Sequence, residues 1–318
     1  MKDEKIQVLR AIAIIAVVMI HTCPSGLEQV VCRPFLNFAV PLFLFLSAYL
    51  TKEQHDGWIP LYKRRIIRVF IPYVIWTFIY TLPSSGIFPY VYNLMTTKSC
   101  YTLYYIFVYI QLVLMTPLLF KLAKSSYRWI GWLVAPISIF AFKYTGYIWG
   151  IELNNKISIL WSISFLGWLP FYYMGICLRG KESSILSNAK LISILLFVSI
   201  LLQWAEGYLF LNQGIGNCGT AVKLTSLLSN SLFILLFWII LQKDNININI
   251  PQLVLIGNYS FGIYLLHPLV LQFIQRWDFY CNIPFVLNSA LVLIISLAIC
   301  YFASKVLGQK LNQWIGIK

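Results

Sequence analysis

The sequence predicts an all-α integral membrane protein, a bundle of about ten transmembrane helices. Hydrophobic residues make up 60% of the chain and charged residues only 11%, whereas soluble domains have about 45–50% apolar and about 25% charged residues. The mean hydropathy is +0.77. The apolar residues gather in long runs, and short segments rich in proline, glycine and asparagine separate these runs. Composition and pattern therefore exclude an ordinary soluble domain.

Each run is a candidate for a membrane-spanning helix, which needs about 17–25 residues; the fifth is the shortest. The runs cover residues 6–22, 35–50, 66–82, 103–119, 129–142, 158–178, 191–211, 221–241, 253–273 and 285–307. Turn-forming segments such as CPSG (23–26), NQGIGN (212–217) and CNIP (281–284) mark their ends. Because the linkers are short, we expect one transmembrane domain over residues 1–318 and no separate soluble domain.

The basic residues predict the orientation of the bundle. The formal net charge of +14 would suggest a polyanionic partner in a soluble protein, but these charges fall in short loops, and we expect no nucleic-acid partner. An excess of lysine and arginine marks the cytoplasmic side, so we expect both termini in the cytoplasm and the protein in the inner or plasma membrane. Of the 24 lysines and arginines, the outer loops then hold only Arg33, Lys98, Lys143, Lys156, Lys223 and Arg276.

The cysteines predict neither a defined disulfide framework nor a metal site. Two of the seven lie within helices, and the others fall in or beside outer loops: Cys23, Cys32, Cys100, Cys218 and Cys281. Outer disulfides can form in an oxidising compartment, but the sequence does not fix their pairing. We expect no metal, because no pair of cysteines or histidines has close ligand spacing.

The first run carries two ionisable residues, Arg10 and His21, in LRAIAIIAVVMIHT (9–22). At about 100° per residue the step from one to the other is about 1100°, roughly 20° beyond three turns, so both side chains share one face about 16 Å apart along the axis. Charges facing lipid are costly, so this face should point into the protein or a wet cavity. Alternatively, Arg10 snorkels to the inner headgroups and His21 lies at the outer interface.

This pair is followed by further motifs in chain order: VPLFLFLSAYL (40–50), the pair Arg65 and Arg68 in YKRRIIRVFIPY (62–73), LYYIFVYIQLVLMTPLL (103–119) and SFGIYLLHPLV (260–270). Together they resemble the acyltransferase-3 family of ten-helix membrane acyltransferases, nearest to the branch that contains the enterobacterial common antigen O-acetyltransferase. The similarity runs over most of the chain.

The chain departs from the family pattern at three places. Ser47-Ala48 stands where the family often has Ser-Gly, and Asn37 stands where it often has an arginine four residues before the proline. Thr102-Leu103-Tyr104 replaces the usual His-Leu-Trp. We expect Ala48 to have a mild effect, whereas Asn37 and Thr102 bear on the acceptor side, so the resemblance predicts the reaction class rather than the substrate.

The resemblance implies an O-acyltransferase, expected to be an O-acetyltransferase, that moves an acyl group from cytoplasmic acyl-CoA to a sugar hydroxyl of a surface polysaccharide, glycolipid or lipid-linked precursor. Acyl-CoA is then the donor substrate, and no tightly bound cofactor is expected. The expected partners are acyl-CoA, a glycan or glycolipid acceptor, the lipid bilayer and polysaccharide-assembly proteins. His21 would be the catalytic residue, because neutral imidazole, with a pKa near ~6.5, can take the proton of a hydroxyl or accept the acyl group itself. The sequence leaves both modes open.

Three arginines at the start of the third run, Arg64, Arg65 and Arg68, project near one another, since residues three or four apart are neighbours on a helix. Guanidinium groups suit phosphate oxygens, so with Arg10 they would bind the phosphates of acyl-CoA. The alternative is that segment 63–68 only anchors the helix at the cytoplasmic face. The position of Arg68 inside the apolar run argues against this alternative.

Glu206, in LLQWAEGYLFL (201–211), is an intramembrane carboxylate and therefore a candidate functional group. It would be catalytic if it lies beside His21 and fixes its tautomer, as a triad acid does. It could equally be an interfacial residue in a helix that ends early.

Four residues are predicted to line a pocket: Ser47, Tyr104, Tyr264 and His267. Pro268 removes a backbone donor from the carbonyl near Tyr264, so GIYLLHP is expected to form a kinked, polar wall. A packed kink with a satisfied histidine is the simpler interpretation of His267, and close helix packing is the simpler one of Ser47.

A transporter or flippase for a lipid-linked glycan is the competing hypothesis, because it would also use many helices, buried charges and broken helices. The sequence shows no symmetry between two halves, and the pattern of His21 with Arg65 and Arg68 has no natural explanation in transport. A glycan polymerase would need a long outer loop, and the outer loops here are short. Only the acyltransferase should bind acyl-CoA.

Overall fold

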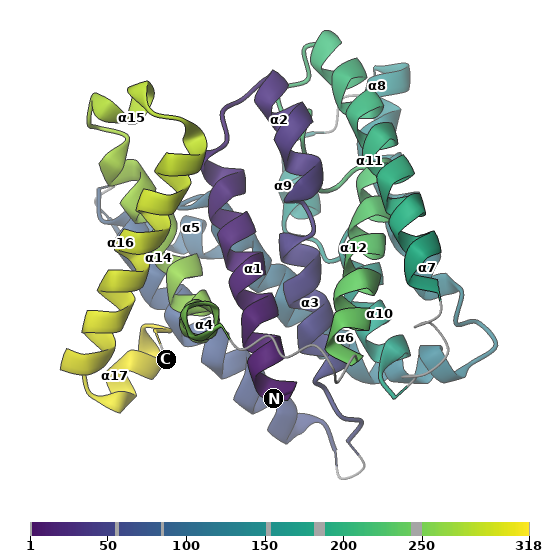
Figure 1. Ribbon diagram of the computed structural model, residues 1–318. Helices are drawn as coiled ribbons and strands as arrows, with labels where there is room; N and C mark the ends of the chain where they lie inside the picture. Colours follow the sequence, from purple (N-terminus) through teal and green to yellow (C-terminus); the bar gives the residue numbers. More distant parts are fainter. Residues whose placement is uncertain are drawn as a thin grey trace.

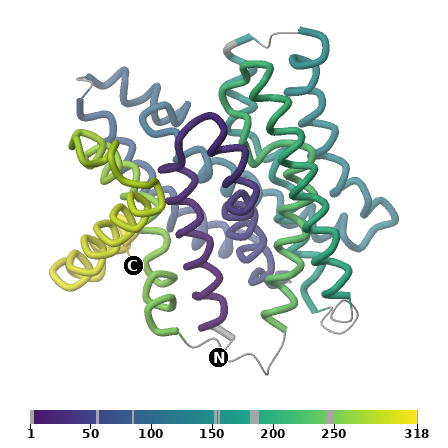
Figure 2. Tube along the Cα trace, turned by 45° about the horizontal axis from the view of Figure 1, so that its top comes forward, coloured from purple at the N-terminus to yellow at the C-terminus, as the bar shows by residue number. Residues whose placement is uncertain are grey.

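A computed structural model of the chain describes residues 2–54, 57–83, 86–150, 154–180, 188–242 and 250–317. Within these ranges every regular element is a helix and no strand occurs, which confirms the all-α prediction. The helices form a bundle with both chain termini at the same end (Figures 1 and 2). Lys181, Lys243 and Lys318, which the charge pattern assigns to the inner side, lie outside the described residues.

Helix α1 (Lys2–Thr22) runs through the middle of the bundle and contacts α3, α12, α13, α14 and α16. Ala11, Ala13 and Ile14 have no exposed surface, as expected for a helix that is apolar on nearly all sides. The elements that follow are α2 (Leu27–Cys32), η1 (Arg33–Phe35), α3 (Ala39–Tyr49), α4 (Ile59–Thr81), α5 (Ile87–Thr96), η2 (Tyr101–Leu103) and α6 (Tyr104–Lys124).

The second half of the chain mixes long helices with many short ones. Its elements are α7 (Ile130–Ile139), the π-helical turn η3 (Phe140–Tyr144), α8 (Thr145–Trp149), α9 (Asn155–Ser162), α10 (Leu169–Leu178), α11 (Ala189–Asn212), α12 (Leu224–Gln242), α13 (Pro251–Asn258), α14 (Ser260–Ile274), α15 (Phe279–Asn282), α16 (Phe285–Val306) and α17 (Gln309–Trp314).

Six helices in the described part of the chain are long and apolar enough to cross a membrane, or up to seven if the bent pair α13–α14 is one span. Each expected run contains a helix, but run 35–50 begins with a turn before α3, and run 158–178 is broken between α9 and α10. Run 253–273 bends by 76° between α13 and α14. This bend lies at Tyr259, whereas Pro268, where a kink was expected, lies inside α14. The count of ten spans therefore stays a prediction.

Two glycines allow helices to approach closely enough to build the interior. A β-carbon at Gly175 of α10 would lie 2.5 Å from the carbonyl oxygen of Phe45 and 2.7 Å from the β-carbon of Ala48 on α3. A β-carbon at Gly257 of α13 would collide with the backbone of Gln7 on α1. Small residues of this kind permit tight packing between membrane helices, so Ala48 serves the α3–α10 contact.

All seven cysteines lie in the described residues, and none of them forms a disulfide there. Cys23, Cys100, Cys218 and Cys300 are buried, and Cys281 is exposed. At the end of α1, burial raises the pKa of the Cys23 thiol to about 11, so this cysteine is a poor nucleophile near neutral pH.

Candidate functional site

A cavity of about 920 Å³ lies between α1, α3, α4, α6, α13, α14 and the C-terminal segment. It extends from Lys63 and Arg64 on α4 to His21 on α1. The structure brings most of the predicted site residues together in its lining: Arg10, His21, Ser47, Arg64, Arg65, Arg68, Tyr104 and Tyr264. The shared face of Arg10 and His21 thus points into the protein.

One end of the cavity is strongly basic. Arg10 lies close enough to Arg65 and Arg68 for the three charges to interact. Arg65 donates from Nη1 to the carbonyl oxygen of Ser47 at 3.2 Å and to its Oγ at 3.1 Å. No carboxylate in the described ranges forms an ion pair with the four cavity arginines. Like charges held together without a counterion favour an anionic ligand.

His21 lies toward the other end of the cavity and is half-buried. Its ring makes an edge contact with Tyr101 at 5.0 Å and stacks on His267 at 5.4 Å between ring centroids. Arg33 approaches from the loop side, where it donates to the carbonyl oxygen of Ile20 at 3.2 Å. No described residue hydrogen-bonds to the His21 ring, so its nitrogens are free to act on a substrate.

His267 does not line the cavity but lies behind His21 on α14. It is completely buried, and its Nδ1 is 3.0 Å from the carbonyl oxygen of Ile263. Nearby, the Tyr264 hydroxyl donates to the carbonyl oxygen of Thr102 at 2.6 Å, and this bond ties α14 to the start of α6. Tyr264 thus lines the cavity, whereas His267, which was also predicted to line it, does not, and α14 continues through Pro268.

Glu206 lies in a different cluster, at the outer end of α11 by the predicted orientation. Its carboxylate pairs with Lys223 Nζ at 3.7 Å and accepts hydrogen bonds from the hydroxyls of Tyr144 and Thr225. Lys223 also donates to the carbonyl oxygen of Cys218 at 2.9 Å. These contacts account for Glu206 within the described residues, and none reaches His21, so the structure gives no basis for Glu206 as the acid that orients His21.

The charges of Glu206 and Lys223 also act on Lys143, which lies just beyond α7 on η3, and change its pKa. Burial and the nearby charge of Lys223 lower the pKa of Lys143 to about 8, against the opposing effect of Glu206. The Lys223 ammonium also lies over the ring of Phe210, 5.7 Å from its centroid. Charges here are compensated by one another and by aromatic rings.

Asn37 and Thr102, the two other departures from the family pattern, are both buried. Asn37 is buried and donates from Nδ2 to Gln203 Oε1 at 3.0 Å and to the carbonyl oxygen of Gly219 at 3.2 Å. It therefore joins the start of α3 to α11 and the segment before α12. Thr102 is buried and lines the cavity.

Several cavity residues were missed by the sequence analysis. Tyr105 and Tyr109 lie one turn apart on α6 and line the cavity beside Arg10, and their spacing could have indicated this. Gln313 and Trp314 come from the C-terminal segment, which no motif distinguishes. This segment is fixed by the Trp76 indole, which donates to the carbonyl oxygen of Ile315 at 3.0 Å.

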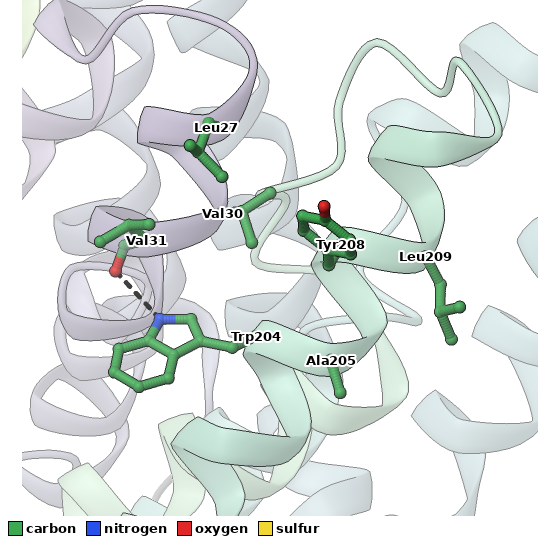
Figure 3. A pocket seen from close by; sticks show the side chains of 7 residues that line it. All are labelled: Leu27, Val30, Val31, Trp204, Ala205, Tyr208 and Leu209. Atoms are coloured by element: carbon green, nitrogen blue, oxygen red, sulfur yellow. Dashed lines mark hydrogen bonds between the residues drawn. The ribbon is translucent and has the colours of Figure 1, made fainter.

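A second hollow, of about 540 Å³, lies between α2 and α11 (Figure 3). Its lining is apolar and aromatic: Leu27, Val30, Val31, Trp204, Ala205, Tyr208 and Leu209. The Trp204 indole donates to the carbonyl oxygen of Val31 at 3.1 Å across its wall. It contains no acid, base or cation from the predicted site, so the candidate site is the larger cavity.

Comparison with known proteins assigns the chain to a family. A family model described as an acyltransferase domain matches residues 3–305, nearly the whole chain. No curated protein and no solved structure gives a significant match. The matched range contains the arginine cluster, His21 and His267. The chain therefore belongs to the acyltransferase-3 family, and with its several apolar helices it is a multi-pass membrane acyltransferase.

Proposed function

We propose that the protein is an O-acyltransferase, most simply an O-acetyltransferase, that moves an acyl group from cytoplasmic acyl-CoA to a sugar hydroxyl of a surface polysaccharide, glycolipid or lipid-linked precursor. One observation carries this proposal: a single cavity has arginines without a carboxylate partner among the described residues at one end and His21 toward the other. A group that binds phosphate and a group that handles acyl transfer thus share one space. The branch of the family stays a prediction.

The donor fits this cavity by its chemistry. The phosphates of acyl-CoA would bind at Arg64, Arg65, Arg68 and Arg10, since guanidinium groups make strong, paired hydrogen bonds with phosphate oxygens. The pantetheine arm is long and thin, so it could follow the face of α1 over the roughly 16 Å that separates Arg10 from His21 along the helix axis. The thioester would then lie beside the imidazole of His21.

His21 supplies the chemistry at the far end. A sugar hydroxyl is a weak nucleophile until a base takes its proton, and a neutral imidazole can do this or accept the acyl group first. The ring contacts of His21 with Tyr101 and His267 hold it in place, while its nitrogens have no described protein partner.

The proposed orientation has both termini in the cytoplasm and the arginine end of the cavity on the same side. Single cysteines at Lys98 and Lys310, in a variant without native cysteines, test it by labelling with a membrane-impermeant maleimide. Lys98 should react from outside the intact membrane and Lys310 only after permeabilisation. Reaction of both from the same side would overturn the orientation.

The enzyme proposal is tested with membranes that contain matched amounts of wild type, His21→Ala or Arg68→Ala. Labelled acetyl-CoA is added on the cytoplasmic side, and label in surface glycan is measured. The wild type should label glycan, His21→Ala should fail, and Arg68→Ala should label much more slowly when acetyl-CoA is kept near the wild-type KM. Equal labelling in all three would make His21 and Arg68 membrane anchors and would favour the transporter, which should move glycan without using acetyl-CoA.

A further inference from the structure

The position of His267 is unusual for a histidine with a purely structural role. It has no exposed surface, yet its ring stacks on that of His21 with 5.4 Å between centroids and 27° between planes. Two imidazoles thus lie side by side at the end of the cavity, one lining it and one behind.

The hydrogen bond of His267 fixes its tautomer. Nδ1 lies 3.0 Å from the carbonyl oxygen of Ile263, and a carbonyl oxygen can only accept, so Nδ1 must carry a proton. In the neutral ring Nε2 then has no proton and presents a lone pair. This hydrogen bond to a carbonyl four residues earlier in α14 therefore makes Nε2 the basic nitrogen of the ring.

That basic atom has no partner. His267 Nε2 is buried and makes no hydrogen bond in the described structure. A buried acceptor without a donor is costly, and most such groups in folded proteins are satisfied. No described residue supplies this donor, and the neighbouring His21 lies where a substrate hydroxyl would arrive.

We propose that the two histidines divide the reaction, His21 taking the acyl group and His267 acting as the base for the acceptor hydroxyl. This inference rests on the function proposed above and deepens it. His21 borders the donor cavity and His267 does not, so the thioester reaches His21, while the hydroxyl that attacks the acyl group approaches with its proton near His267.

The steps balance as follows. A nitrogen of His21 attacks the thioester carbon, the C–S bond breaks with its electron pair on sulfur, and the sulfur takes the proton from the other nitrogen of His21, which leaves neutral acylimidazole and free CoA. The acceptor oxygen then attacks the acyl carbon as His267 Nε2 takes its proton. The C–N bond breaks with its pair on His21, and His267 returns the proton to His21, so both histidines end neutral.

The variant His267→Asn separates this role from packing. The asparagine amide can still donate to the carbonyl of Ile263, but it offers no basic nitrogen. Leu269→Ala on the same helix, at a partly exposed apolar position, is the matched control. Size-exclusion profiles and melting curves of purified protein show which variants are folded.

Two readouts on the full-length protein test the proposal. Without acceptor, the burst of CoA released on mixing with acetyl-CoA should be about one per protein in the wild type, Leu269→Ala and His267→Asn, and absent in His21→Ala. With acceptor membranes, His267→Asn should lose acyl transfer by about 10²–10⁴-fold, the contribution typical of a general base, while Leu269→Ala transfers normally.

The outcomes are distinct. Folded His267→Asn that transfers at the wild-type rate would overturn the role of His267, and so would its loss of both the burst and transfer. A burst in His21→Ala would overturn the acylation of His21. If the wild type itself neither releases CoA nor labels glycan, the proposed function fails instead.

Discussion

The molecule contains two groups of charges within its apolar helices, and they are built in opposite ways. The cavity arginines Arg10, Arg65 and Arg68 lie beside open space and have no acidic partner among the described residues. Glu206 and Lys223 form an ion pair, with further hydrogen bonds from Tyr144 and Thr225 and to a backbone carbonyl. The arginines therefore lack a described counterion, whereas the charges of Glu206 and Lys223 are compensated within the protein.

This difference shows that an ionisable residue inside a membrane helix is not by itself a functional site. Such residues are functional candidates by default, and both Glu206 and Arg68 are candidates in the sequence. Arg68 lines a cavity and has no acidic partner among the described residues, whereas Glu206 pairs with Lys223. We therefore propose that the donor binds at the arginines that lack a described carboxylate partner, and that the charges that compensate one another hold helices together.

The largest expected effect on acyl transfer is at the far end of the cavity. His21→Ala should lower kcat/KM by at least about 10²–10⁴-fold, because the variant lacks the imidazole that the reaction needs. The rate of acetyl transfer to glycan in membranes measures this. Protein level and melting temperature are the controls, and a folded variant that retains more than a tenth of wild-type activity would contradict the site.

Arg68→Ala should act on donor binding. Loss of a charge-assisted hydrogen bond costs about 1.5–3 kcal/mol, so the KM for acetyl-CoA should rise about 10–100-fold while kcat changes little. Arg68→Lys should recover part of the affinity, since it keeps the charge without the planar fork. An unchanged KM in Arg68→Ala, measured over a full range of acetyl-CoA, would show that this arginine is only an anchor.

Ser47→Ala should have a smaller effect on the same parameter. It removes the 3.1 Å bond from Arg65 to Ser47 Oγ but keeps the 3.2 Å bond to the backbone carbonyl. A neutral hydrogen-bond partner contributes about 0.5–1.5 kcal/mol, so the KM for acetyl-CoA should rise about 2–10-fold. Loss of all activity in folded Ser47→Ala would instead indicate a direct chemical role for the serine.

Glu206→Gln should have the smallest effect on transfer and a clear effect on stability. Breaking a buried pair leaves Lys223 uncompensated, which typically costs about 3–5 kcal/mol. The melting temperature should fall, and the double variant with Lys223→Gln should recover much of the loss. Activity per folded molecule should stay within about 2-fold of wild type, because substitutions away from the site have small effects. A loss of activity comparable to that of His21→Ala would show that Glu206 takes part in the reaction.

The sequence was sufficient for the helical class and for the arrangement of Arg10 and His21. Helical periodicity is a local constraint, so the spacing of these two residues predicts a shared face without knowledge of their neighbours. The clustering of Arg65 and Arg68 follows from the same rule. Both pairs lie in the lining of one cavity.

Side-chain contacts that depend on how distant helices pack together could not be predicted from the sequence. Glu206 pairs with Lys223 because the segment before α12 folds back against α11, and no local rule gives that arrangement. The 76° bend between α13 and α14 lies at Tyr259 rather than at Pro268, and α13 packs so closely on α1 that a β-carbon at Gly257 would collide with the backbone of Gln7. The contribution of Trp314 to the cavity likewise depends on the fold alone.

The central claim, that the unpaired arginines form a donor site and the paired charges do not, is tested most directly by binding. Labelled acetyl-CoA is titrated onto purified wild type, Arg68→Ala and Glu206→Gln in lipid nanodiscs at low and high salt. The account predicts salt-sensitive binding to wild type and to Glu206→Gln, and affinity at least about 10-fold weaker for Arg68→Ala. Equal binding by wild type and Arg68→Ala, or loss of binding only in Glu206→Gln, would contradict it.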